Sequence, residues 1–147
     1  METFAAVGDA AYNIVLLAHL LCIIVGAGMA FMAPVFVRKA RRIGGRHTED
    51  FAHETNNAVI FPALLFAGVA GGALVGLSDD AFDFEQMWLT VAGVLWIGSL
   101  VLSLVAFPPR WLNIFNADED RRRLARVGLH IVLLLLMIDM IWKESLF

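Results

Sequence analysis

Four long apolar segments dominate the pattern of the chain, and each is long enough to cross a bilayer as a helix. They cover residues 11–37, 57–77, 87–107 and 124–142. A hydrocarbon core of ~30 Å requires about 20 apolar residues in a helix. No segment alternates with a period of two, and an open sheet would leave backbone polar groups unsatisfied in lipid. We therefore predict an all-α fold, an integral membrane four-helix bundle that forms a single domain over residues 1–147.

The composition supports a membrane protein rather than a soluble one. Hydrophobic residues make up 60% of the 147 residues and charged residues only 17%, whereas soluble domains are usually about half apolar and a quarter charged. The first apolar segment has no basic residue before it and is longer than the core of a signal peptide, so we expect it to stay in the protein as a helix.

Basic residues lie almost entirely in two of the connections. Ten of the eleven are Arg38, Lys39, Arg41, Arg42 and Arg46 after the first segment and Arg110, Arg121, Arg122, Arg123 and Arg126 before or at the start of the fourth. By the positive-inside rule both connections face the cytoplasm. The pattern predicts an up-down arrangement with both termini on the outer (periplasmic or extracellular) side, and it favours binding to membrane lipid over nucleic acid.

Small residues and prolines indicate how the second helix packs. Gly68, Gly72 and Gly76 are spaced by four, which lets another helix approach closely in lipid. The partner is either a helix of the same bundle or, in a homodimer or larger complex, a helix of another subunit. Pro34 and Pro62 are each expected to kink or end regular helix. The stretch NADEDRRR predicts an Asn or Asp cap for the fourth helix.

Polar residues at membrane depth are the candidates for function. His53 and His130 are predicted on the cytoplasmic side of the second and fourth helices, where two imidazoles could ligate a b-type haem whose propionates would meet the arginines. The alternatives are that His53 is an interfacial, solvated residue and that His19, at another depth, is a neutral imidazole bonded to a neighbouring group. We expect His19 to face the bundle interior, because an unbonded imidazole in hydrocarbon loses several kcal/mol of hydrogen bonding.

Methionines offer a second type of metal site. Met29 and Met32 are one turn apart on the first helix, and Met137 and Met140 are one turn apart on the fourth. Thioether and imidazole ligands together suit Cu(I), which makes His19 and Met137 candidate metal ligands. The alternative is that the methionines fill irregular gaps between helices.

Other catalytic patterns are absent from the sequence. It contains no HExxH motif, no paired cysteines, no glycine-rich phosphate loop and no Ser-His-Asp arrangement, so no enzyme class is indicated. Asp139 and Lys143 are four residues apart, a spacing that predicts an ion pair near the outer surface.

The stretches AHLLCIIVGAGMAFMAPVFVRKARR, FPALLFAGVAGGALVG and MWLTVAGVLWIGSLVLSLVAFPPRW together resemble the bacterial CopD-like superfamily of integral membrane proteins. The pattern is closest to an uncharacterised four-helix branch related to copper-resistance proteins and HemJ-type protoporphyrinogen oxidases. The resemblance implies the bacterial cytoplasmic (inner) membrane and a haem-linked role for His19. The oxidase branch has a lysine after its third-helix tryptophan, whereas Trp88 here is followed by LTVAG.

Three functions follow as hypotheses from these patterns. The first is a small haem b-binding redox or electron-transfer component with ligands among His19, His53 and His130. The second is a non-catalytic accessory subunit of a larger membrane complex. The third is a copper-handling membrane protein that uses His19 and Met137.

Overall fold

The computed structural model of the chain is all-helical over the residues that it describes, which are 9–42, 48–78, 82, 85–109 and 118–142. Four helical spans are long and apolar enough to cross a membrane: Ala10–Lys39, Phe51–Gly76, Met87–Ala106 and Glu119–Ile141. The predicted all-α class and the four spanning helices are confirmed at this level. Their length and composition indicate a multi-pass membrane protein.

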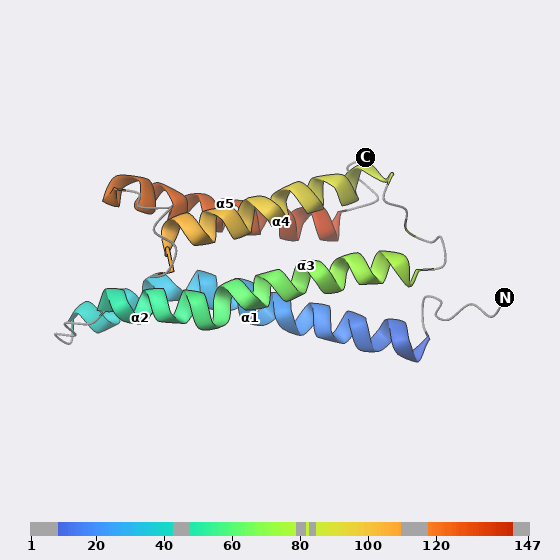
Figure 1. Cartoon of the computed structure of the whole chain (residues 1–147), viewed down its shortest axis with the longest axis horizontal. Coiled ribbons are helices and arrows are strands. Elements are labelled where there is room, and N and C mark those ends of the chain that lie inside the picture. Colours follow the sequence, from blue (N-terminus) through green and yellow to red (C-terminus); the bar gives the residue numbers. More distant parts are fainter. Residues whose placement is uncertain (1–8, 43–47, 79–81, 83–84, 110–117, 143–147) are drawn as a thin grey trace.

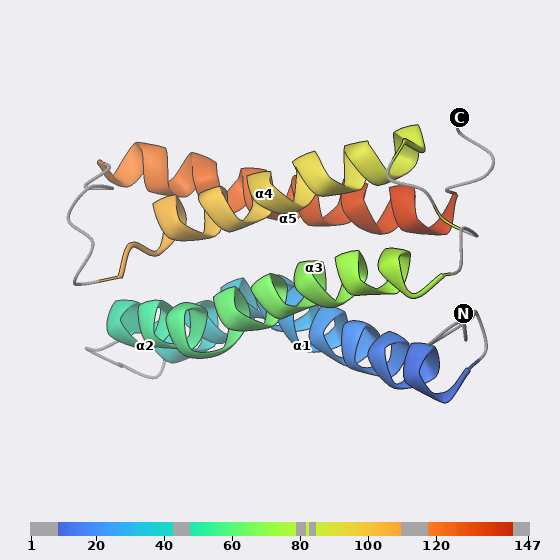
Figure 2. The ribbon, with the colours of Figure 1, turned by 45° about the vertical axis from the view of Figure 1, so that its right-hand side comes forward.

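The helices associate as two pairs. In chain order they are α1 (Ala10–Arg42), α2 (Thr48–Thr55), the π-helix η1 (Asn56–Ile60), α3 (Phe61–Gly76), α4 (Met87–Ala106) and α5 (Glu119–Ile141). Helix α1 packs along α3, and α4 packs along α5 (Figure 1). Figure 2 shows the same two pairs from a second direction, with α3 between α1 and α4. Residues near the middle of both pairs therefore share one core.

The two prolines act differently from each other. Pro62 is the second residue of α3, and the π-helical turn η1 lies directly before it. Proline lacks the N–H that would bond the carbonyl four residues back, and its ring clashes with that carbonyl, so the backbone widens there. The disturbance expected at Pro62 is present. Helix α1, by contrast, continues past Pro34 to Arg42.

Helix ends follow local signals in the sequence. Asp118 caps α5, because its side chain accepts a hydrogen bond of 2.9 Å from the backbone N–H of Arg121. Glu119 and Asp120 occupy the first turn, where acidic groups interact favourably with the helix dipole. Helix α4 ends at Ala106, two residues before Pro108. The predicted cap is confirmed, and Asp118 is the residue that provides it.

Small residues set the distance between α1 and α3. A Cβ atom added at Gly26 would lie 3.0 Å from the side chain of Leu64, so the glycine permits the close approach. The shared core comprises Ala27, Ala30, Ile60, Leu64, Leu129 and Leu133, drawn from both helix pairs. Because lipid provides no hydrophobic drive for helix association, this close contact is what holds the helices together.

Two hydrogen bonds, one partly and one fully buried, join the helix pairs. The indole N–H of Trp96 on α4 donates to the carbonyl oxygen of Leu64 on α3 at 2.8 Å. Asn56, the first residue of η1, accepts a 2.9 Å hydrogen bond from the hydroxyl of Ser103 on α4, and both side chains are fully buried. Such bonds between membrane helices contribute about 0.6 kcal/mol each on average.

The surface of the bundle is apolar along its length. Ile14, Leu17, Leu21 and Ile24 on α1 are all more than half exposed. A row of large exposed hydrophobic side chains on a spanning helix is what contact with acyl chains requires.

Gly68, Gly72 and Gly76 of α3, which the sequence spaces by four, do not have the same role in packing. A Cβ at Gly68 would lie 1.9 Å from the Trp96 ring, so Gly68 serves packing inside the bundle. A Cβ at Gly72 or Gly76 would meet none of the described atoms within 4 Å. Both glycines are exposed, and Gly72 lines an open space, so neither is packed against the described part of this chain.

Substitution of single glycines tests this division. Gly68→Ala is expected to destabilise the purified protein by about 1–3 kcal/mol, because Trp96 must move and its bond to Leu64 is strained. Gly72→Ala is the matched control and should be neutral or slightly stabilising, since alanine favours helix. Thermal unfolding in detergent, followed by circular dichroism, measures both. Equal melting temperatures for the two variants would contradict the packing assignment.

Candidate functional site

His19 is half-buried on the side of α1 that faces α3, and it bonds to the backbone of α3. Its Nδ1 atom is 2.7 Å from the carbonyl oxygen of Ala67 on α3. A carbonyl oxygen only accepts hydrogen bonds, so Nδ1 carries the proton and donates. The prediction that His19 faces the interior and bonds a neighbouring group is confirmed. In the neutral ring, this bond leaves Nε2 with its lone pair.

Gly71 makes room for the His19 ring. A Cβ atom at this position would lie 3.1 Å from Cε1 of His19, closer than nine in ten real contacts of that kind. The ring therefore rests against the backbone of α3, and its orientation is fixed by both the glycine and the Ala67 carbonyl. Fixing one ring nitrogen in this way is how proteins set the tautomer and direction of a histidine ligand.

An apolar cavity of about 240 Å³ lies between the helix pairs at the level of His19. Its lining includes His19, Trp96, Ser99, Met137 and Met140. Within the described part of the chain, Nε2 of His19 has no hydrogen-bond partner. The structure thus brings together the two candidate metal ligands of the sequence, His19 and Met137, and adds a second thioether.

The methionines of α1 do not join this cavity. Met29 packs against the shared core, and Met32 is 45% exposed on the bundle surface. Neither residue is among those that line the apolar cavity. Of the two methionine pairs in the sequence, only the pair on α5 lies at a site with a histidine.

His53 and His130 lie together in a second pocket, also of about 240 Å³, which we call the basic pocket. Its charged lining residues are Arg38, Arg122, Arg126 and Glu119. His53 contacts the Phe107 ring edge to face, with ring centroids 5.7 Å apart. The sequence predicted that these two histidines share one side of the membrane near arginines, and they share one pocket.

The ring nitrogens of His130 both face backbone carbonyl oxygens. Nδ1 lies 2.6 Å from the oxygen of Arg126, and Nε2 lies 3.0 Å from the oxygen of Ala30 on α1. The ring also packs edge to face on Phe31. Ligation of haem iron by His130 would require one of the two carbonyl contacts to break. A bis-histidine haem with His53 stays a prediction, and the present geometry does not favour it.

Several buried polar residues were not found by sequence reasoning. Asn56, Ser99 and Ser103 are almost completely buried, and Ser99 donates to the carbonyl of Trp96 at 2.7 Å. Serine is common in membrane helices, so only knowledge of the neighbouring helix could identify Ser103 as the partner of Asn56. The asparagine immediately before an apolar run was the one available signal.

Asp139 is buried on α5, with only 4% of its surface exposed. Its Oδ2 atom has no hydrogen-bond partner among the described residues. The predicted ion pair with Lys143 lies outside the described residues. Asp139 is two residues after Met137 on α5, but it is not among the residues that line the apolar cavity.

A metal at His19 would depend on sulfur ligands. In residues 9–42, 48–78, 82, 85–109 and 118–142, no group of three or more His, Cys, Asp and Glu side chains could hold a metal ion. One imidazole with one or two thioethers is a donor set that suits a soft monovalent ion such as Cu(I). The residues present therefore fit copper(I) better than a hard divalent cation, which prefers oxygen ligands.

Comparison with known proteins gives no further assignment. No family model, no curated protein and no solved structure matches the chain.

Two substitutions of His130 test its role in joining α5 to α1. His130→Leu removes the ring contacts with the carbonyls of Arg126 and Ala30 and is expected to cost about 0.6–1.7 kcal/mol of stability. His130→Gln places an amide N–H near the position of Nε2 and should retain most of that stability. Thermal unfolding in detergent compares the two. Equal loss in both variants would show that the Ala30 contact contributes nothing.

Proposed function

We propose that this chain is a multi-pass protein of the bacterial inner membrane that binds copper(I) at His19, with thioether ligation from Met137 or Met140. The observation that carries the proposal is the state of the His19 ring. One nitrogen is held by the Ala67 carbonyl, the other has no partner among the described residues, and the ring lines the same cavity as two thioethers.

The apolar surroundings of His19 favour a soft, singly charged ion over a doubly charged one. The cavity is lined almost entirely by apolar side chains and glycines. A low-dielectric environment makes a doubly charged ion expensive to bury, whereas a singly charged ion with neutral ligands costs much less. The resemblance to a superfamily that includes copper-resistance proteins points in the same direction.

The arrangement of charges supports a defined orientation for this site. Arg38 of α1 and Arg122 and Arg126 of α5 line one pocket, so the two basic regions of the sequence meet at one end of the bundle. By the positive-inside rule that end is cytoplasmic, with an up-down arrangement and both termini outside. The His19 cavity then lies in the outer half of the membrane.

A copper(I) titration tests the proposal. The full chain in detergent, under reducing conditions, should take one Cu(I) per chain from a chromophoric chelator. His19→Asn is expected to weaken binding by about tenfold or more, since even outer-shell changes have effects of that size. Its amide N–H can replace Nδ1–H at Ala67, so the fold should be kept.

Two further variants sharpen the copper test. Met137→Leu combined with Met140→Leu should weaken binding, because both thioethers of the cavity are lost while its apolar volume is kept. His53→Asn, in the basic pocket, is the control and should bind as the unchanged chain does. Equal affinity of the unchanged chain and His19→Asn would refute the assignment.

Haem b with His19 as an axial ligand is the second candidate. It is favoured by the glycines Gly71, Gly72 and Gly93 in the cavity lining, which leave flat surface beside the ring. The protein purified with added haem should then give a reduced-minus-oxidised spectrum with Soret and alpha bands that His19→Asn abolishes. The lack of such bands, with copper bound, would leave copper as the occupant.

A further inference from the structure

The basic pocket combines positive charge with an apolar floor, and it is separate from the His19 cavity. Three arginines and one glutamate line it, so its formal charge is +2 with neutral histidines. Glu119 is already engaged in an ion pair with Arg126. The pocket therefore presents positive charge that the described acidic residues do not neutralise.

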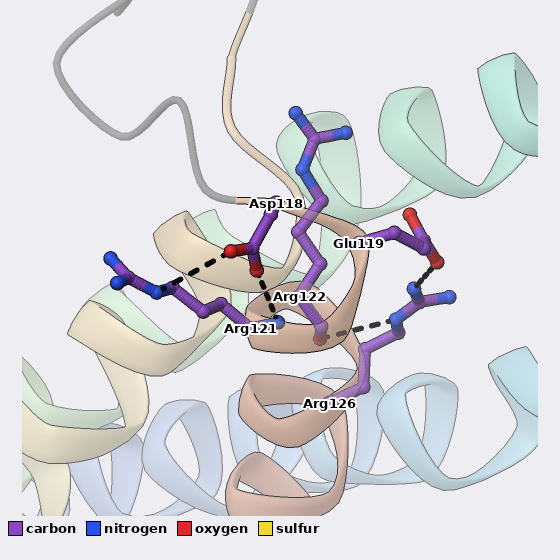
Figure 3. A network of polar contacts seen from close by, with 5 residues as sticks. All are labelled: Asp118, Glu119, Arg121, Arg122 and Arg126. Atoms are coloured by element: carbon purple, nitrogen blue, oxygen red, sulfur yellow. Dashed lines mark hydrogen bonds and ion pairs between the residues drawn. The ribbon is translucent and has the colours of Figure 1, made fainter.

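Arg122 provides the clearest sign of a missing partner. Its Nε atom is buried and has no hydrogen-bond partner among the described residues. In Figure 3 the guanidinium of Arg122 extends away from Arg121, and its only drawn contact is made by its backbone oxygen, with Arg126. A buried donor on a charged group loses substantial hydrogen bonding unless an acceptor is supplied. An anionic oxygen in the pocket would supply one.

The apolar residues of the pocket indicate which kind of molecule would bring an anionic group there. Ala30, Ala33, Pro34, Ile60 and Leu129 form its apolar part, and three of them belong to the shared core. A free, fully hydrated anion gains nothing from such a surface, whereas a hydrocarbon chain does. Arginine forks match the oxygens of a phosphate group in geometry and charge. The occupant should therefore join a phosphate to an apolar tail.

We propose that the basic pocket binds the headgroup phosphate of an anionic phospholipid, with Arg122, Arg126 and Arg38 around the phosphate and the start of an acyl chain against the apolar floor. Pockets of this kind, between membrane helices at the positively charged end, are placed at the level of lipid headgroups. The site goes beyond the copper function and shares no residue with it, so either can fail alone.

Lipid binding to the full chain in neutral detergent tests this site. Native mass spectrometry follows titrations with phosphatidylglycerol and with phosphatidylcholine of the same acyl chains. Phosphatidylglycerol should bind about tenfold more tightly or better, and Arg122→Gln should remove about tenfold of its affinity. Arg123→Gln is the matched control: it removes the same charge from an exposed neighbour on the same helix, and it should change affinity less than about twofold.

Further arms separate the sources of the effect. Arg122→Lys keeps the positive charge but lacks the Nε donor, so it should bind phosphatidylglycerol more weakly than the unchanged chain does. This variant replaces Arg122→Gln in the test if Arg122→Gln does not fold. Inorganic phosphate at the same concentration should not displace phosphatidylglycerol. The proposal is wrong if the two lipids bind equally, if Arg122→Gln and Arg123→Gln have the same effect, or if phosphate alone competes as well as the lipid.

Discussion

The structure depends on backbone carbonyls of α3 that accept hydrogen bonds from aromatic side chains of the helices on either side. His19 of α1 donates to Ala67, and Trp96 of α4 donates to Leu64, one turn earlier. Each carbonyl is followed four residues later by a glycine, Gly71 in the first case, which leaves the space that the ring occupies. In hydrocarbon no water can satisfy a ring N–H. A side chain at either glycine would therefore cost both packing and a hydrogen bond.

This arrangement explains why α3 is central and why two cavities exist. Helix α3 is hydrogen-bonded to α1 within its own pair and to α4 in the other pair. The two pairs also meet at the core residues around Ile60, Leu64 and Leu129. Some residues of that core line the apolar cavity and others line the basic pocket, and the two linings have no residue in common. The polar link of Asn56 to Ser103, placed where Pro62 widens the helix, adds a fixed contact beside it. Two spaces of different chemistry can then be kept apart in one small bundle.

The sequence predicted the features that depend on composition and on a single helix. Four spans, the Asp118 cap and the inward direction of His19 all follow from hydropathy, local hydrogen bonding and the cost of an unbonded imidazole. It could not predict which helix a polar group meets. The four-residue spacing of Gly68 and Gly72 suggested one face, yet only Gly68 is packed, because helix periodicity alone does not fix where a neighbour crosses. The pairing of Asn56 with Ser103 depends on the same unknown.

The two interior histidines show why such contacts decide chemistry. His19 and His130 both lie in apolar helices, and their sequence surroundings are similar. His130 is placed so that its own helix offers the Arg126 carbonyl to one nitrogen while α1 offers the Ala30 carbonyl to the other. Among the described residues His19 meets one carbonyl, and its ring lines a cavity. The His130 ring has a backbone carbonyl at each nitrogen, and whichever nitrogen carries the proton donates to one of them. The His19 ring is oriented by one carbonyl, and its second nitrogen can still bind a ligand. The difference lies in the neighbouring backbone rather than in the residue.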